Sequence, residues 1–402
     1  MPENMANGRG LVSTGVLLRH GDCGNMKMDA PVEQPVEATR ERLMSLDALR
    51  GFDMFWIIGG YWIMGGLAKG LDNLWFNKYI LPQTDHVRWE GFVAWDLIMP
   101  LFLFVVGAAM PFSFARRLGP DDNKAQLYGH ILYRVFILWI LGMIAQGRLL
   151  DYDLSKLQLY SNTLQAIAAG YLIASLILLN LALQWQILAT GGLLLAYWAL
   201  LMLVPVPGHG AGQLTEQGNL AFYIDTLILG RFQDGTNPPY TWILSSMTFG
   251  ATVMSGALAG QLLRSDRTKT EKVVVLLISG VACVLLGWAW GQIFPIIKHI
   301  WTSSMVLYAG GWSLLLLGLF YLAIDVLEYR FLTSFFVVIG MNAIAVYMAT
   351  HVFDFRVLGD IFVRNLAQWT GDWHDFVRAV AGMAILWFIL YYMYRKRTFI
   401  KI

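Results

Sequence analysis

The chain has 402 residues, of which 57% are hydrophobic and only 14% are charged. Soluble domains average about 25% charged residues, so this composition excludes an ordinary water-soluble core. The 16 tryptophans, 17 tyrosines and 39 glycines are typical of membrane helices with aromatic belts. The net charge of +2 gives no indication of a nucleic-acid partner, and the two cysteines, Cys23 and Cys283, have neither metal-ligand spacing nor a disulfide framework.

The N-terminal segment contains one short apolar stretch, LVSTGVLL, which Arg19 and His20 follow directly. A secretory signal peptide needs a cleavage site with small residues after such a stretch, and the sequence has none there. We therefore expect residues 1–41 to form a flexible tail and residues 42–402 to form a single membrane domain.

From residue 51 onward, apolar runs recur at lengths near the roughly 20 residues that a helix needs to cross a bilayer. We predict ten such spans, and hence an all-α polytopic membrane protein with its helices in one bundle. The first run is the weakest, because glycines and Asp53 dilute it. The ten predicted spans cover approximately residues 51–68, 92–114, 127–146, 163–183, 186–204, 242–263, 273–293, 302–323, 332–353 and 376–394.

The distribution of Lys and Arg predicts the orientation. With ten spans both termini lie on one side of the membrane, together with the basic connections ARRLGPDDNK, RSDRTKTEK and YRKRTFIKI. Basic residues are enriched in cytoplasmic loops. We therefore expect both termini in the cytoplasm and the QTDH loop, residues 83–86, outside.

A histidine and an aspartate stand at the entry of the second predicted span, at positions 86 and 96. A lone histidine at a membrane surface is commonly an interfacial residue, whereas a carboxylate inside a span is costly unless it is paired or hydrated. A re-entrant start to the span would bring Asp96 to His86. A carboxylate that holds an imidazole raises its basicity and fixes its tautomer. His86 and Asp96 are therefore a candidate catalytic pair.

Further polar side chains occur at membrane depth. Each of them alone is commonly a hydrogen-bonding contact between helices. Together with His86 and Asp96, they could line one internal cavity. They are Gln165, Thr302, Ser303, Ser304 and Asn342.

Several blocks of the sequence resemble the heparan-α-glucosaminide N-acetyltransferase family. The blocks are RLMSLDALRGFDMFWIIGG, HVRWEGFVAWDLIMPLFLFVVG, SNTLQAIAAGYL, FPIIKHIWTSSMVLYAGG and FFVVIGMNAIAVYMATHVF, and they extend over most of residues 42–353. The family consists of polytopic proteins that move an acetyl group from cytosolic acetyl-CoA to a terminal glucosamine across a membrane. The spacing H-x-x-W-x-G-x-x-x-x-D-L is the most specific part of the match.

The resemblance implies a function and a set of site residues. The family's proposed catalytic histidine falls on His86, its membrane aspartate on Asp96, and its ninth-span asparagine on Asn342. It implies acetyl-CoA as acyl donor, an amino sugar or glycan as acceptor and no metal. The short tail and the ten spans are expected of a bacterial member in the cytoplasmic membrane. Whether the chain forms a homodimer is left open by the sequence.

Acetyl transfer from a thioester to an amine needs a base for the amine proton and donors for the oxyanion. His86 fits the base, either within a ternary complex, which we favour, or as a covalent acetyl carrier. Arg50, beside Asp47, is placed to meet CoA phosphates. The remaining residues that we expect to contact the acetyl-CoA are Gln165, Ser303, Ser304 and Asn342.

Two other functions are compatible with the sequence. An O-acyltransferase of an envelope glycan would share the donor and differ in the acceptor. A transporter of small sugars would also need polar residues at mid-depth. Many secondary transporters contain internal repeats, whereas the SLDALRG and HVRWEG blocks each occur once here.

Overall fold

The computed structural model describes residues 43–117, 124–331 and 333–400 of the chain. All regular structure in this part is helical, and the only strand-like pairings are the isolated bridges Glu90–Ile297 and Val206–Gly210. The all-α prediction is therefore confirmed. The predicted tail, residues 1–41, lies outside the described residues.

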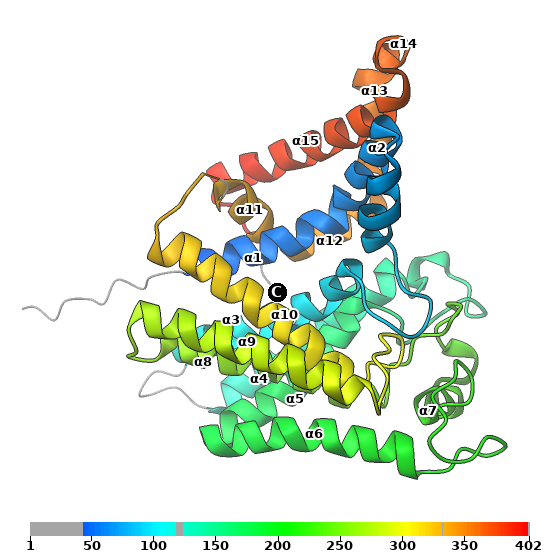
Figure 1. Cartoon of the computed structure of the whole chain (residues 1–402), viewed down its shortest axis with the longest axis vertical. Helices are drawn as coiled ribbons and strands as arrows, with labels where there is room; N and C mark the ends of the chain where they lie inside the picture. Colours follow the sequence, from blue (N-terminus) through cyan, green and yellow to red (C-terminus); the bar gives the residue numbers. More distant parts are fainter. Residues whose placement is uncertain (1–42, 118–123, 332, 401–402) are drawn as a thin grey trace, which may run out of the picture. The chain divides into compact units, whose positions relative to one another are not determined.

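The helices follow one another along the chain (Figure 1). Those of the first half are α1 (Met44–Phe55), α2 (Tyr61–Leu71), α3 (Ile98–Arg117), α4 (Lys124–Ala145), α5 (Thr163–Asn180), α6 (Leu183–Leu203) and α7 (Leu220–Leu229). Those of the second half are α8 (Ser246–Arg264), α9 (Lys269–Gly291), α10 (Ser303–Tyr321), α11 (Thr333–Gly340), α12 (Ala343–Val352), α13 (Phe355–Val363), α14 (Ala367–Thr370) and α15 (His374–Arg395). Single turns of π or 3₁₀ helix extend several of them, including Trp56–Gly60, Ala94–Leu97 and Leu322–Val326.

Seven helical segments of the described chain are long and apolar enough to cross a membrane, or eight if the bent pair α11–α12 is one span. The protein is therefore an integral membrane protein. Helices occupy all ten predicted positions, but those at 51–68 and 242–263 are outside this set. The helix at 242–263, α8, is buried along most of its length among other helices. Such a helix can carry Ser, Thr and Gly because little of it faces lipid.

The predicted span at 332–353 is broken. Its two halves, α11 and α12, meet at an angle of 72°. Asn342 lies at the break and precedes the first residue of α12. A broken helix at membrane depth is tolerated where protein covers its freed backbone groups.

Glycines allow the closest helix contacts. A Cβ atom on Gly256 of α8 would lie 1.9 Å from the Phe104 carbonyl oxygen of α3, and one on Gly107 of α3 would lie 1.9 Å from the Val253 oxygen of α8. The backbones of α3 and α8 therefore touch directly, which is the packing that small residues permit between membrane helices. This contact fixes α3, whose N-terminal extension carries Asp96.

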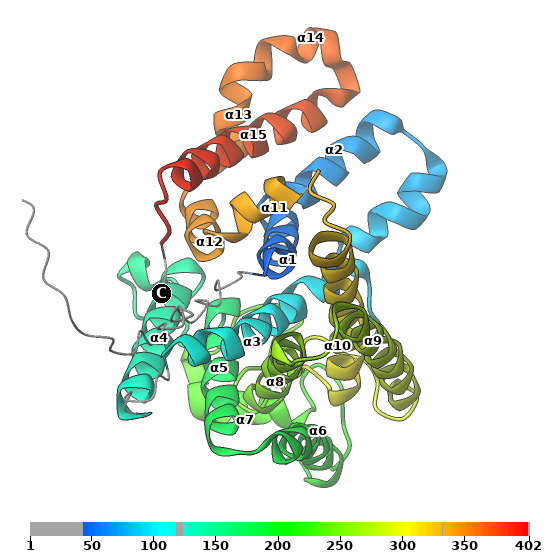
Figure 2. The same ribbon diagram turned by 90° about the vertical axis from the view of Figure 1, so that its left-hand side faces the viewer.

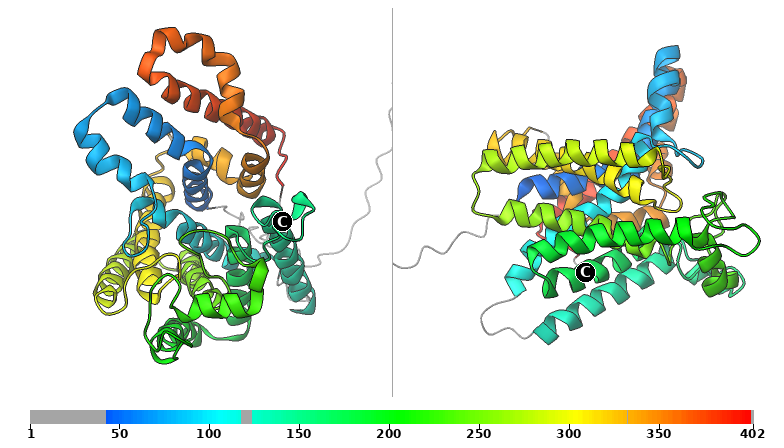
Figure 3. Two further views of the ribbon diagram at one scale, coloured as in Figure 1. Left: turned by 90° about the vertical axis from the view of Figure 1, so that its right-hand side faces the viewer. Right: turned by 60° about the horizontal axis from the view of Figure 1, so that its bottom comes forward.

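The long helices run between two ends of the bundle, and the right-hand view of Figure 3 shows α6 and α9 with roughly aligned axes. At one end, Lys269 donates to the Asp325 carbonyl oxygen and Arg264 to the Pro111 carbonyl oxygen. Residues 85–96 and the loop 292–302 meet at the other end, where the Gly91 N–H donates to the Ile296 oxygen. Helix α15 lies beside both α2 and α13 (Figures 1 and 2).

Candidate functional site

The backbone before α3 brings His86 and Asp96 together. A 3₁₀ turn, Leu81–Thr84, ends at Asp85, whose Oδ1 accepts the His86 N–H at 2.8 Å. A second 3₁₀ turn, Ala94–Leu97, leads into α3, and the Asp96 Oδ2 accepts the Val93 N–H at 3.2 Å. The carboxylate thus satisfies an N–H group at the start of a helix, where the helix dipole favours negative charge.

The side chains of His86 and Asp96 are in direct contact. The His86 Nδ1 lies 2.7 Å from the Asp96 Oδ1, and the side chains are 41% and 2% exposed, respectively. An Nδ1–H that donates to the carboxylate leaves the Nε2 lone pair free. The Nε2 atom has no hydrogen-bond partner in the described chain. The predicted contact is therefore present, with the second ring nitrogen available to a substrate.

Lys298 is a third member of this cluster, and it is not among the site residues predicted from the sequence. Its Nζ lies 3.4 Å from the Asp96 Oδ1 and 3.2 Å from the His86 Nδ1, and its side chain is only 7% exposed. Burial lowers the pKa of Lys298 to about 8, against the opposing effect of Asp96. A lysine between apolar residues in FPIIKHIW was the available signal, but its partner, Asp96, lies in a distant part of the sequence.

The hydroxyl groups of Thr302, Ser303 and Ser304 hold the loop that carries Lys298. The Thr302 Oγ1 accepts the Ile297 N–H at 3.1 Å, and Ser304 donates to the Pro295 oxygen at 3.1 Å. Ser303 donates to the Leu194 oxygen of α6 at 2.7 Å. All three are fully buried. Their contacts position Lys298, and their role toward acetyl-CoA stays a prediction.

Gln165 and Asn342 are not in contact with the His86 cluster. Gln165 accepts the Ser161 N–H at 2.9 Å and donates to the Leu159 oxygen at 2.7 Å, which orders the start of α5. Asn342 donates to the Thr398 oxygen at 3.3 Å and accepts the Ile400 N–H at 3.0 Å. Each amide is therefore used locally, and Asn342 connects the α11–α12 break to the C-terminal segment.

Aromatic rings surround His299, the neighbour of Lys298. The imidazole stacks on Tyr240 at 4.2 Å and on Trp89 at 5.4 Å between ring centroids. Burial, followed by the charge of Lys298, lowers the pKa of His299 to about 4. His299 is therefore neutral near pH 7 and packs as an aromatic residue.

The predicted CoA-binding pair lies at the other end of the bundle. The Arg50 Nη1 contacts the Asp47 Oδ1 at 3.0 Å in α1. The nearby Ser45 N–H donates to the Asp325 Oδ2, at the end of α10 and its π turn. That segment has 24 residues and starts beside the Lys298 loop. At 1.5 Å per residue it is about 36 Å long, so the pair and His86 lie on opposite sides of the bundle.

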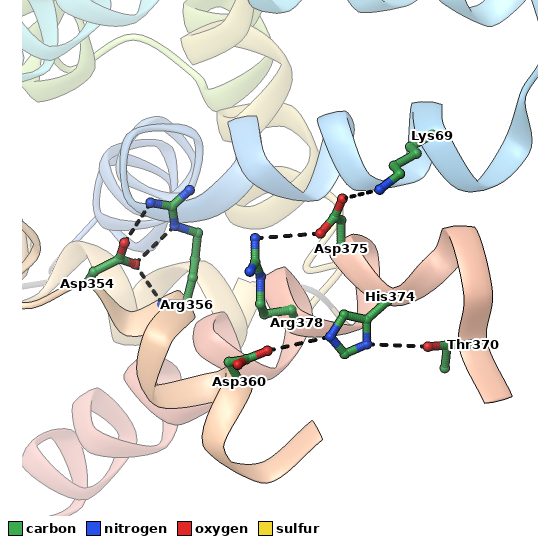
Figure 4. A network of polar contacts seen from close by, with 8 residues as sticks. All are labelled: Lys69, Asp354, Arg356, Asp360, Thr370, His374, Asp375 and Arg378. Atoms are coloured by element: carbon green, nitrogen blue, oxygen red, sulfur yellow. Dashed lines mark hydrogen bonds and ion pairs between the residues drawn. The ribbon is translucent and has the colours of Figure 1, made fainter. Parts of the chain in front are cut away.

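A cavity of about 420 Å³ adjoins the His86 segment. Figure 4 shows polar groups at its edge: Lys69 of α2 contacts Asp375 at 2.8 Å, Asp375 contacts Arg378 at 3.5 Å, and Arg356 pairs with Asp354 at 2.6 Å. The cavity is lined by Tyr61, Trp62, Gly65, Gly66, Leu81, Thr84, Asp85, Arg356, Asp375, Arg378 and Ala379. A second cavity, of about 280 Å³, lies between the Trp56–Gly60 turn with the start of α2 on one side and α12, α13 and α15 on the other.

The fold and the cluster together define an integral membrane protein with an imidazole, a buried carboxylate and a buried amine at one end of its helices. Such a site can accept and return a proton. Among the residues that the structure describes, no group of three or more His, Cys, Asp or Glu is arranged to hold a metal ion.

Comparison with known proteins shows distant similarity to heparan-alpha-glucosaminide N-acetyltransferase of Homo sapiens. The identity is 24% over 433 aligned residues, which cover 92% of this chain and 62% of the human protein. The protein of the same name from Mus musculus is also 24% identical, over 91% of this chain and 61% of its own length. The chain thus spans about three-fifths of the length of these relatives. No family profile matches it.

Proposed function

We propose that the protein is a transmembrane acetyltransferase that moves the acetyl group of acetyl-CoA to the amine of an amino sugar. The observation that carries this proposal is the cluster of His86, Asp96 and Lys298, in which one imidazole nitrogen is held and the other is free. The similarity to acetyltransferases over nearly the whole chain supports the same reaction class.

In the proposed reaction, the neutral amine attacks the thioester carbonyl carbon. A C–N bond forms, and the C–S bond to CoA breaks. The His86 Nε2 takes the proton that the amine loses and returns it to the leaving thiolate. Asp96 holds the Nδ1–H and stabilises the imidazolium that forms transiently. This is general base catalysis followed by general acid catalysis by one residue.

Lys298 acts in this proposal as a positioning residue. Its ammonium group lies within 3.4 Å of the Asp96 Oδ1, on the Nδ1 side of the His86 ring. It therefore offsets the cost of burying the carboxylate and keeps Asp96 ionised beside the imidazole. The donor and the acceptor would approach from opposite ends, with the CoA phosphates near Arg50 and the sugar near His86.

The membrane arrangement belongs to the same proposal. We place the Arg50 end in the cytoplasm, where acetyl-CoA is found, and the His86 end outside, in the cytoplasmic membrane of a bacterium. The basic residues Arg264, Arg267 and Lys269 at the Arg50 end support this orientation through the positive-inside rule.

The test is the rate of a His86→Ala variant between pH 6 and 9, with acetyl-CoA and glucosamine. Loss of a general base lowers the rate by about 10²–10⁴-fold, so acetyl transfer near pH 7 should almost vanish while CoA binding persists. A higher pH deprotonates the amine without the enzyme's help and should partly restore the rate. A variant that had lost a covalent acetyl carrier would show no such recovery.

His209→Ala is the matched control, because His209 is an exposed histidine in a connecting loop, outside the cluster. It should retain the wild-type rate across the whole pH range. A wild-type rate in His86→Ala near pH 7 would remove His86 from the site.

A further inference from the structure

The cavity beside His86 has the size and the composition of a small-molecule site. Its volume of about 420 Å³ lies within the roughly 300–1,000 Å³ of ligand pockets. Two of its lining residues, Thr84 and Asp85, directly precede His86 in the chain. The Asp85 carboxylate accepts the His86 backbone N–H, so the position of the cavity wall is coupled to the position of the imidazole.

A series of aromatic rings connects this cavity to the imidazole. Trp62 and Tyr61 line the cavity and contact each other edge to face at 4.9 Å. Tyr61 lies 5.4 Å from Trp95, which lies 6.3 Å from the His86 ring. Flat aromatic surfaces of this kind can pack against the C–H face of a sugar ring, while its hydroxyl groups point elsewhere.

The polar part of the lining contains cations and carboxylates in equal number. Arg356 and Arg378 are the cations, and Asp85 and Asp375 are the carboxylates. Guanidinium groups only donate hydrogen bonds and carboxylates only accept them, whereas sugar hydroxyl groups do both. A balanced lining therefore matches a polyhydroxylated ring better than a simple anion, which would need an excess of cations.

These polar groups are already held in position. The Arg356 guanidinium lies 3.6 Å from the centre of the Trp62 ring and pairs with both oxygens of Asp354. Asp375 lies between Arg378 and Lys69, as Figure 4 shows. Side chains that are fixed before binding lose little entropy when a ligand arrives, which favours affinity.

We propose that this cavity binds the acceptor amino sugar, an inference that rests on the proposed function. The sugar ring lies against Trp62 and Tyr61, and its hydroxyl groups bond to Arg356, Arg378 and Asp375. Asp85 faces the amine, which points toward the His86 Nε2.

The inference is tested by protecting an introduced thiol. A Cβ atom on Gly65, which lines the cavity, would meet no heavy atom within 4 Å, so Gly65→Cys should fold normally. The variant is made in a Cys23→Ser, Cys283→Ala background. Glucosamine, added at increasing concentration, should slow maleimide labelling of this cysteine at least severalfold.

Leu154→Cys is the matched control. Leu154 is 68% exposed in the loop after α4, at the same end of the bundle and outside the cavity. Its labelling should not depend on glucosamine. Suppose that the protein acetylates glucosamine, but saturating glucosamine does not slow maleimide labelling of Gly65→Cys. This result would overturn the assignment of the cavity and leave the proposed function intact.

Protection without acetyl transfer would have the opposite meaning, since the cavity would bind the sugar while the proposed function failed. If glucosamine neither protects the cysteine nor is acetylated, both proposals are overturned.

Kinetics give a second measurement, because Arg378→Gln removes cavity hydrogen bonds and leaves the His86 cluster unchanged. A hydrogen bond is worth about 0.5–1.5 kcal/mol, so the KM for glucosamine should rise about twofold to twelvefold, with kcat and the KM for acetyl-CoA nearly constant.

Discussion

At the scale of single residues, the two oxygens of Asp96 have separate tasks. The Oδ2 atom accepts a backbone N–H at the start of α3, which is a structural role. The Oδ1 atom meets both His86 and Lys298. An amide in place of the carboxylate could keep the first contact through its oxygen, whereas it cannot stabilise an imidazolium or neutralise an ammonium group. The structural and the catalytic roles of Asp96 are therefore separable by mutation.

Asp96→Asn should fold and lose most of its acetyl transfer, by about 10²-fold or more, because the base loses its charged partner. The measurement is the initial rate with glucosamine, alongside CoA binding, which should not change. The double variant Asp96→Asn/Lys298→Met also removes the buried ammonium group that the single change leaves unpaired. It should be more stable than the single variant and equally inactive. Normal activity in Asp96→Asn would show that the carboxylate is structural only.

Lys298 gives the site a pH dependence whose sign follows from its burial. Its pKa is about 8 in the folded protein and 10.5 ordinarily. Between these values the unfolded chain binds the proton that the folded protein has lost. The contribution of Lys298 to stability therefore rises as the pH increases from 8 to 10.5.

Lys298→Met should lack this rise, because methionine does not titrate. The difference in Tm between the wild type and the variant, measured in detergent from pH 7 to 10.5, should shift in favour of the wild type as the pH rises. Acetyl transfer by the variant should be reduced, since Asp96 loses its cation. A pH-independent Tm difference would contradict the assignment of a depressed pKa to Lys298.

The sequence was sufficient for one half of this cluster. A carboxylate at the entry of a span requires a partner, and a re-entrant start to the span would bring Asp96 to His86, so their contact could be predicted. Lys298 comes from a distant loop and becomes adjacent only when residues 90–91 and 296–297 meet. No local pattern encodes that meeting.

At the scale of elements, α3 owes its position to α8. Gly256 and Gly107 lie where the two backbones touch, and the described part of α8 is mostly buried. A methyl group on Gly256 would lie 1.9 Å from the Phe104 backbone oxygen. A backbone atom cannot turn aside as the end of a flexible side chain can. The helices would have to separate, and Asp96 would move with α3.

Gly256→Ala should therefore destabilise the protein by about 1–3 kcal/mol, the range for overpacked interiors. It should also reduce acetyl transfer. Gly129→Ala on α4 is the matched control, since its Cβ would meet no heavy atom within 4 Å. There, alanine should leave stability unchanged or raise it by up to about 1 kcal/mol, through its higher helix propensity. Thermal unfolding in detergent measures both, and equal effects of the two variants would contradict the packing argument.

Hydropathy predicted the positions of the helices because a span must be long and apolar, whatever its partners. It could not predict the 72° break between α11 and α12, since the residues around Asn342 are as apolar as those of an unbroken span. At the break, Asn342 binds the C-terminal segment through both ends of its amide, and these partners are more than 50 positions away in the sequence.

At the scale of the whole described bundle, the proposed direction of acetyl transfer depends on which end faces the cytoplasm. The loop that carries Leu154 is at the His86 end of the bundle. Tyr160, at the end of this loop, contacts Trp242. The residue before Trp242, Thr241, donates its backbone N–H to the oxygen of His299, the neighbour of Lys298. The connection that carries Asp266 is at the Arg50 end, between α8 and α9. Both residues are accessible positions for a cysteine.

In cells that express the cysteine-free background, Leu154→Cys should react with a membrane-impermeant maleimide, and Asp266→Cys should react only after the membrane is permeabilised. The reason is that the basic connection RSDRTKTEK favours the cytoplasmic side, which also contains acetyl-CoA. Retained acetyl transfer in both variants would show that the labelled protein is folded. The reverse labelling pattern would place His86 in the cytoplasm, and the acceptor sugar would then have to be a cytoplasmic one, with no transfer across the membrane.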